Sequence, residues 1–143
     1  MGKLFLGKYE RSLDEKGRLL LPSKLIGEEK TSWYILRGFE GCLAIYPEEK
    51  FMEAMQRLQE LDWNDPANRA YIRLATSSAS ELKLDSHGRV LLGKEILGDY
   101  QIQRDVTIIG SLDHFEIWDT VSFARYQLAH GSQFEALAPR KKA

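Results

Sequence analysis

The chain repeats itself, and this repeat limits the folds open to its 143 residues more than any other feature. The segment LDEKGRLLL at 13–21 returns 71 positions later as LDSHGRVLL at 84–92. The correspondence continues downstream at a spacing of 72, where 35–38 matches 107–110 and 43–46 matches 115–118. Several matches in one order indicate a duplication rather than coincidental hydrophobic patterning. We therefore expect two similar units in one chain.

Each copy predicts short strands, tight turns and a longer helix. The first copy predicts strands at 5–13, 18–21, 33–36 and 42–46, and a helix from 48 to about 61 with Pro47 at its first position. The second copy predicts strands at 81–84, 90–92, 105–109 and 115–118, a short helix at 94–97 and a helix at about 120–130.

Capping residues mark where several helices begin. Ser23 is expected to cap a short helical turn at 24–26, and Asp119 to cap the helix at 120–130. Asp65, which precedes a proline, predicts a further helix between the copies. The elements together predict an α+β fold. Because about four short strands rarely stand alone, the two halves are expected to interleave into one compact barrel, and any open strand edges favour oligomers.

The charge of the chain is nearly balanced, since 20 Lys and Arg residues face 21 Asp and Glu residues. Such a balance does not by itself indicate a nucleic-acid partner. Residues 1–27 nevertheless carry six cations against three anions, and 140–143 add three more cations. Charge alone favours a solvated surface, although basic segments can meet phosphate. From Gly131 the pattern is lost, and the basic tail is expected to be mobile.

Composition also excludes several classes of protein. The lone Cys42 cannot form an internal disulfide and fits a reducing cytoplasm. No window approaches the roughly 20 apolar residues that span a bilayer, and residues 1–9 have no apolar signal core. We expect a cytoplasmic protein without a membrane partner.

The duplicated turn is the strongest candidate for a functional site. In the first copy Gly17 permits a sharp reversal, and Asp14 can accept turn amide hydrogens or pair with Arg18 and orient it. Arg18 presents a planar fork suited to phosphate or to guanine O6 and N7, and Lys16 supplies a point charge. The second copy repeats the set as Asp85, Gly88 and Arg89. The alternative is a stable hairpin whose arginine contacts nothing.

The segment GKYERSLDEKGRLLLPSK at 7–24 resembles the opening signature of the bacterial MraZ proteins. The paired Asp-x-x-Gly-Arg turns, the turn at 37–39 and the strand at 116–118 resemble that family too, so the likeness covers nearly the whole chain. The resemblance implies tandem modules of the AbrB and SpoVT type, a swapped-hairpin barrel that is double-psi-like, with a helix after each module. It divides the chain into a first module at 8–50, connecting helices at 51–78, a second module at 79–122, and a C-terminal helix and tail at 123–143.

The same resemblance implies a sequence-specific transcriptional regulator and not an enzyme. It implies binding of double-stranded DNA at repeated short sites in the promoter of the protein's own operon, the division and cell-wall gene cluster. It further implies a ring-shaped homo-oligomer, expected to be an octamer, in the cytoplasm at the nucleoid. No cofactor is expected. The DNA-contacting residues are expected to be Lys16, Arg18, Arg89, Lys8, Arg11 and Lys24.

Two departures from the pattern concern the second turn. Gly93 stands where the first copy has proline, and His87 stands where it has Lys16. The second turn is therefore expected to contact DNA less tightly than the first, or to be mainly structural. A solvated strand edge is an equal alternative for Lys8 and Arg11.

Other candidate residues favour structural roles. Ser23, which stands beside Lys24, is better suited to cap a helix than to act as a nucleophile. The spacing of Asp85, His87 and His114 does not match that of a metal-binding site. Cys42 is expected to be buried, and the repeated aromatics are expected to pack in the core rather than stack on bases: Tyr46, Phe51, Trp118 and Phe123. The alternative function is a module of the same fold that binds a protein partner, as an antitoxin or assembly factor does. A small hydrolase is disfavoured, since no nucleophile, base and orienting group are recognisable.

Overall fold

A computed structural model describes residues 3–27 and 31–139 of the chain, so the basic tail expected to be mobile lies outside the described residues. The strands are β1 (Lys8–Ser12), β2 (Arg18–Leu20), β3 (Trp33–Arg37), β4 (Leu43–Pro47), β5 (Ser80–Leu82), β6 (Arg89–Leu91), β7 (Asp105–Gly110) and β8 (Phe115–Asp119). The α-helices are α1 (Ser23–Ile26), α2 (Glu48–Gln59), α3 (Pro66–Ser77), α4 (Lys94–Asp99), α5 (Thr120–His130) and α6 (Phe134–Leu137), and two short 3₁₀ segments are η1 (Phe39–Gly41) and η2 (Gly131–Gln133).

The strands of the two copies interleave rather than forming two separate sheets. A six-stranded antiparallel sheet has the order β1-β7-β8-β4-β3-β5, and β2 pairs with β6 in a second, two-stranded sheet. Exchanging each strand for its counterpart in the other copy reproduces both orders. The chain therefore has an internal pseudo-twofold axis between β4 and β8, and the interleaving expected from the duplication is confirmed. The described sheet has edge strands, β1 and β5, and does not close into a barrel.

Pairing register corrects the repeat alignment in one strand. Trp33 pairs with Pro47 in the first copy, and Val106 pairs with Asp119 in the second, which makes Trp33 the counterpart of Val106. The spacing from β3 to β7 is thus 73 and not 72. Burial gives the physical reason, because Trp33 and Val106 both lie in the core whereas Asp105 is exposed. A one-residue slip would turn the apolar set to the opposite face of the strand.

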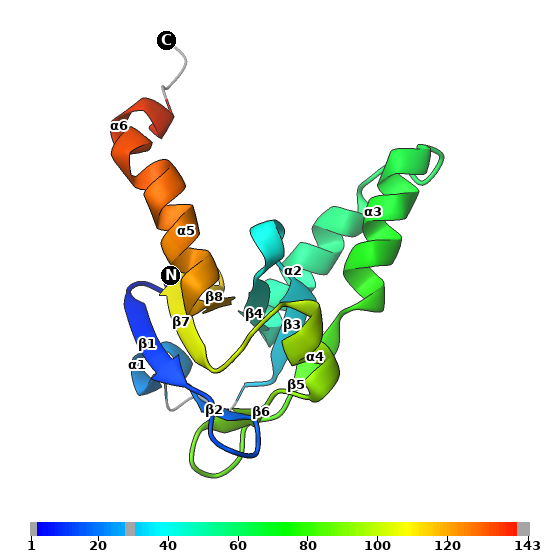
Figure 1. Ribbon diagram of the computed structural model, residues 1–143. Helices are drawn as coiled ribbons and strands as arrows, with labels where there is room; N and C mark the ends of the chain where they lie inside the picture. The colour runs from blue at the N-terminus through cyan, green and yellow to red at the C-terminus, as the bar shows by residue number, and fades with distance from the viewer. Residues whose placement is uncertain (1–2, 28–30, 140–143) are drawn as a thin grey trace.

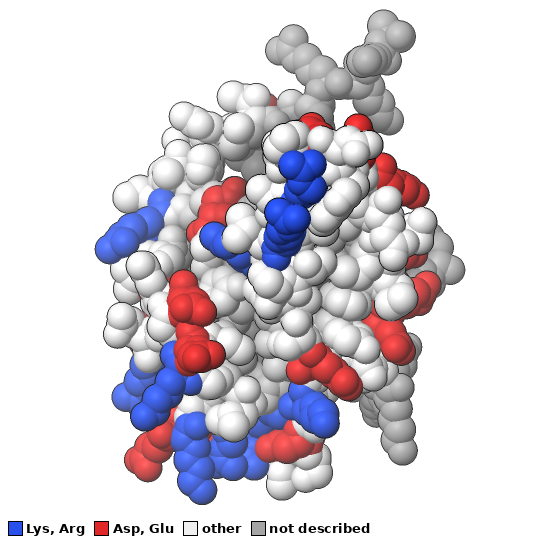
Figure 2. Space-filling model, turned by 90° about the vertical axis from the view of Figure 1, so that its right-hand side faces the viewer, with Lys and Arg blue, Asp and Glu red and all other residues white. Residues whose placement is uncertain are grey.

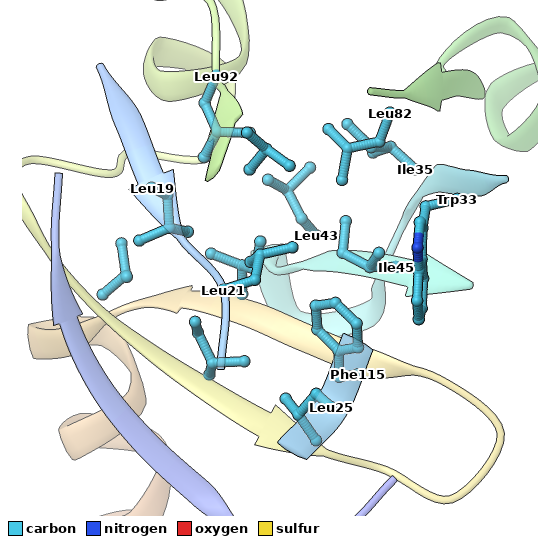
Figure 3. Packing of buried hydrophobic residues seen from close by; sticks show 14 of the residues in the cluster. Leu19, Leu21, Leu25, Trp33, Ile35, Leu43, Ile45, Leu82, Leu92 and Phe115 are labelled. Atoms are coloured by element: carbon cyan, nitrogen blue, oxygen red, sulfur yellow. The ribbon is translucent and has the colours of Figure 1, made fainter. Parts of the chain in front are cut away.

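The core lies between the sheets and draws equally on both copies. Leu19, Leu43, Ile45, Val90, Phe115 and Ile117 are each fully buried. Phe5, Trp33 and Phe115 form an aromatic cluster with ring centroids 5.7–6.0 Å apart. Figure 3 shows Leu19 and Leu21 from the β2 segment in one cluster with Leu43 and Phe115 of the large sheet. Both copies therefore contribute to one shared core, while Leu36 and Ala44 of the first copy also pack against Ala54 of α2 in a smaller cluster.

Several local expectations need correction. Ser23 is the first residue of α1 rather than its cap, since Pro22 occupies the cap position and no side chain caps that helix. Pro47 likewise precedes α2, which ends at Gln59. The expected strand at 5–13 is interrupted at Gly7, whose φ of +99° takes the chain out of strand conformation. The Asp119 and Asp65 caps are confirmed, because their carboxylates accept the backbone N–H groups of Ser122 and Ala67.

Two helical arms rise from the sheet on the side away from the β2–β6 pair (Figure 1). One arm is α2 with α3. The other is α5, the expected helix, continued by η2 and α6, which lie in the part of the chain after His130 where the sequence shows no pattern. The arms expose large apolar side chains: Met52, Trp63, Tyr71, Leu74, Val121, Leu128, Phe134 and Leu137. Among the described residues, no helix is long and apolar enough to cross a membrane.

Candidate nucleic-acid interface

The first Asp-x-x-Gly-Arg turn is built around one carboxylate. Oδ1 of Asp14 accepts the backbone N–H groups of Lys16 at 2.9 Å and Arg18 at 2.8 Å. Oδ2 accepts Nε of Arg18 at 2.7 Å, so both the turn and the side chain after it are held by Asp14. Gly17 completes the reversal with φ of +79°, a conformation that suits glycine.

The second turn reproduces this geometry. Oδ1 of Asp85 accepts the N–H groups of His87 and Arg89, both at 2.9 Å, and Oδ2 accepts Nε of Arg89 at 2.9 Å. Gly88 has the same φ of +79° as Gly17. The sequence offered acceptance of turn amides or pairing with the arginine as alternative roles for Asp14, and in the structure each aspartate has both.

Hydrogen bonding stabilises both carboxylates in their charged form. The backbone N–H of Arg18 is the main cause that lowers the pKa of Asp14, and that of Arg89 does the same for Asp85. Each arginine uses only Nε in its ion pair, and within the described residues neither Nη group has a recorded partner. The side chains are about one-third exposed, at 33% for Arg18 and 31% for Arg89. Each guanidinium is thus oriented at one end and free to bind at the other.

The two turns hold each other in place. The carbonyl of Gly17 accepts the N–H of Leu92 at 3.0 Å, and that of Gly88 accepts the N–H of Leu21 at 3.1 Å. With the β2–β6 pairing, these bonds put both turns at one end of the molecule, opposite the helical arms (Figure 1). Figure 2 shows Lys and Arg side chains gathered at this same end with Asp and Glu among them.

A cleft of about 810 Å³ opens beside the first turn, and we call it the first-turn cleft. It is lined by residues 13–17, 91–94, 97, 103 and 104. Its basic side chains are Lys16, Lys94 and Arg104, all exposed. Lys94 and Arg104 were not among the predicted site residues, because their nearness to the first turn depends on the pairing of the two copies.

The other predicted cations lie in three different settings. Lys8 is at the far end of β1, within 3.7 Å of Glu10 and 3.5 Å of Gln127 on α5. Arg11 donates from Nη1 to the neighbouring backbone carbonyl of Glu10 at 2.8 Å. Because side chains alternate along a strand, Lys8 and Arg11 project from opposite faces of β1. Lys24 is exposed on α1.

The remaining candidates have structural surroundings. Cys42 is buried, as predicted, and burial raises the pKa of its thiol far above the ordinary range. His87 contacts Ser86 in the second turn, whereas His114 contacts Asp113 and Glu116 at β8. No group of three His, Cys, Asp or Glu side chains that could hold a metal occurs among the residues described.

The repeated aromatics pack within the protein. Tyr46 stacks on His114, Phe51 stacks on Tyr34, and Trp118 meets Phe123 edge to face. Trp118 is 5% exposed, and Tyr46 and Phe51 pack against a small cluster of buried residues beneath α2. These contacts confirm the expectation of structural packing.

Comparisons with known proteins agree with the duplicated organisation. The family described as "MraZ protein, putative antitoxin-like" matches twice, over residues 4–74 and 75–142. The chain is 36% identical over 135 residues to a protein of Limosilactobacillus fermentum named transcriptional regulator MraZ, which covers 94% of each chain. Proteins of the same name from Corynebacterium urealyticum and Moorella thermoacetica are 35% and 31% identical, with 93% and 96% of each chain covered.

Proposed function

The chain belongs to the MraZ family, a family of transcriptional regulators rather than enzymes, and we propose that it regulates transcription by sequence-specific binding of double-stranded DNA. The two Asp-x-x-Gly-Arg turns are the proposed contacts. The observation that carries the proposal is the pair of hydrogen bonds from arginine Nε to the aspartate of the same turn, which orient the guanidinium groups of Arg18 and Arg89 at one end of the molecule.

An arginine held in this way suits nucleic-acid recognition. Its Nη groups can donate together to guanine O6 and N7 or to a phosphate, and prior orientation reduces the entropy lost on binding. In the proposed interface Arg18 and Arg89 are the principal contacts, and Lys16 provides a phosphate contact at the tip of the first turn. Arg11 and Lys24 would add phosphate contacts. Lys8 is the least favoured of the set, because it lies against α5.

We further propose the domain division stated above and a swapped-hairpin arrangement of the two modules, in which the open six-stranded sheet and the β2–β6 pair enclose the shared core. The interleaving of β1 with β7 and of β3 with β5 supports the exchange of strands between modules 8–50 and 79–122. The segments 51–78 and 123–143 would then be the helical parts that follow each module.

Assembly into a ring-shaped homo-oligomer, proposed to be an octamer, would give a near-neutral chain enough DNA affinity. The exposed apolar side chains of the two arms support self-association, as do the edge strands β1 and β5. A ring presents many turns at once, and linked contacts raise avidity by roughly 10²–10⁴ when the DNA sites repeat with matching geometry. The proposed targets are repeated short sites in the promoter of the protein's own division and cell-wall operon, bound in the cytoplasm at the nucleoid.

A second candidate is a module of this fold that binds a different protein. The apolar arms favour it, because Leu128 and Phe134 are 85% and 77% exposed. In that case the arms would carry the activity, and the turns would serve only as structure.

Fluorescence anisotropy with a fragment from upstream of the protein's own gene separates the two candidates. The Arg18→Ala variant is compared with the wild type over a salt series, beside random DNA of equal length. Arg73→Ala is the control, because Arg73 is an exposed arginine on the α2–α3 arm. Removing a contact to a base costs about 1–3 kcal/mol, so we expect affinity to fall roughly 5- to 150-fold per site in Arg18→Ala and little in the control.

Size-exclusion chromatography accompanies the binding measurement. The proposal expects Arg18→Ala to elute with the wild type, since the turn would bind DNA without holding subunits together. A fall to monomers would overturn the assignment of Arg18. Absence of any preference for the upstream fragment at every salt concentration would favour the protein-partner module instead.

A further inference from the structure

We propose that the first-turn cleft binds a phosphate group of the DNA backbone, with Lys94 and Arg104 as contacts in addition to the turns. This inference rests on the proposed function and makes it more specific. The first turn would then position DNA by two means, the clamped arginine and a neighbouring basic cleft.

The charges around the cleft favour a phosphate. Lys16, Lys94 and Arg104 are exposed there, and no ion pair involving any of them is recorded in the described part of the chain. The two acidic residues that line the cleft are Asp14 and Glu15, and Asp14 is already paired with Arg18. The cleft is thus lined by three cations and by one carboxylate, that of Glu15, for which the described residues show no arginine partner. A surface of this balance attracts an anion and neutralises phosphate charge.

The cleft lies beside the proposed DNA contact. Asp14 both lines the cleft and holds Nε of Arg18 at 2.7 Å, which ties the guanidinium to the edge of the cleft. The carbonyl of Arg104 accepts the N–H of Leu13 at 2.9 Å, so the segment before β7 is attached directly to the start of the turn. A strand whose base or phosphate meets Arg18 can therefore place a neighbouring phosphate in the cleft.

The pseudo-twofold axis provides an internal comparison. The counterparts of Lys16 and Lys94 are His87 and Ser23, at the spacing of 71 that relates the turns. The counterpart of Arg104 is Thr31, at the spacing of 73 that relates β3 to β7. The same backbone arrangement thus has lysine or arginine at three positions around the first turn where the second copy has histidine, serine and threonine, and the reverse at one, where Gln103 corresponds to Lys30. Turn geometry alone does not require these cations, which points to a role in binding.

The test measures DNA affinity and its salt dependence for a double variant, Lys94→Gln with Arg104→Gln. The control is Arg73→Gln with Arg125→Gln, which removes two exposed charges from α3 and α5 on the opposite side of the sheet. Because these helices belong to the arms, size-exclusion chromatography checks that the control elutes with the wild type. Each neutralised phosphate contributes a slope of about −0.9 in log K against log salt. Loss of two contacts therefore lowers the slope by about 1.8 per site, and affinity by about 30-fold at 0.15 M salt. The loss should be equal for the upstream fragment and random DNA.

Each outcome has a definite meaning. A lower slope in the cleft variant, with the control unchanged, supports the phosphate site. If wild type and cleft variant bind with the same slope and affinity, the inference is wrong while the proposed function stands. If the cleft variant and the control lose the same affinity and slope, the effect comes from the total charge of the protein, and the proposed phosphate site is wrong. If the wild type binds no DNA, both the proposed function and the inference fail.

A variant that adds cations distinguishes loss of a phosphate contact from misfolding, because misfolding would not strengthen DNA binding. Ser23→Lys with His87→Lys adds cations at the positions of the second turn that correspond to Lys94 and Lys16, both exposed. If nearby cations bind phosphate, this variant should bind DNA more tightly and with a steeper salt slope. Unchanged binding in a folded variant would contradict the inference.

Discussion

The two Asp-x-x-Gly-Arg turns have the same internal geometry but different surroundings. Their aspartate hydrogen bonds agree within 0.2 Å, and their glycines share a φ of +79°. Around the first turn stand Lys16, Lys94 and Arg104, whereas the second has His87 at its tip. The comparison shows that the two copies share the hydrogen bonds and backbone conformation of the turn but differ in the charged residues around it. Local hydrogen bonds require the motif residues, but no part of the turn requires the neighbouring cations.

The largest expected effect tests whether the turns depend on one common core. Leu19 and Val90 follow the two arginines, pair with each other across β2 and β6, and are fully buried. Leu19→Ala should lower the free energy of unfolding by about 2–5 kcal/mol, because it removes buried carbons and leaves a cavity. Val90→Ala should cost less, since it removes fewer atoms.

Urea denaturation followed by circular dichroism measures both changes. The double variant should depart from additivity, because the two side chains are in register and share one site. If the two changes in unfolding free energy are strictly additive, Leu19 and Val90 do not stabilise each other, and the two turns are independent units.

The next effect concerns the arginines themselves. Arg89→Ala should weaken DNA binding less than Arg18→Ala, for which about 1–3 kcal/mol per site is expected, because His87 stands at the tip of the second turn where the first has the cation Lys16. Anisotropy titrations of both variants on one DNA fragment at one salt concentration measure the difference. Equal losses would show that the turns contribute equally in spite of their surroundings.

The smallest effect extends the comparison to β4 and β8. His114 occupies the place of Cys42, and its ring nitrogens lie 2.7 Å from Asp113 and 3.2 Å from Glu116. Burial is the largest influence and opposes charge on the ring. The hydrogen bonds and charges of Glu116 and Asp113 together outweigh burial, so the pKa of His114 is raised above 6.5.

A raised pKa stabilises the folded state fully below the unfolded value and loses this contribution as pH rises through the folded value. The free energy of unfolding of the wild type should therefore fall between about pH 6 and pH 8 relative to His114→Gln. Urea midpoints at several pH values measure the difference. Parallel pH profiles for wild type and variant would contradict a stabilising charge at His114.

Much of the candidate site could be predicted because its interactions are local. Asp14, Gly17 and Arg18 lie within five consecutive residues, and the hydrogen bonds of the carboxylate follow from that spacing. The caps at Asp65 and Asp119 are local in the same sense. Lys94 and Arg104 could not be predicted as neighbours of the first turn, because about 80 residues or more separate them from it in the chain.

The amino-acid sequence by itself determined the repeat, the two turns, the main strands and the start of the longer helices, since each follows from residues close together in the chain. Only the tertiary structure decided that β1 pairs with β7 and β3 with β5, that β3 and β7 correspond at a spacing of 73, and that cations of the second copy stand beside the first turn. The physical reason is that pairing between distant strands depends on which apolar faces can be buried together. For Trp33 and Val106, that condition is met only when the whole core is assembled.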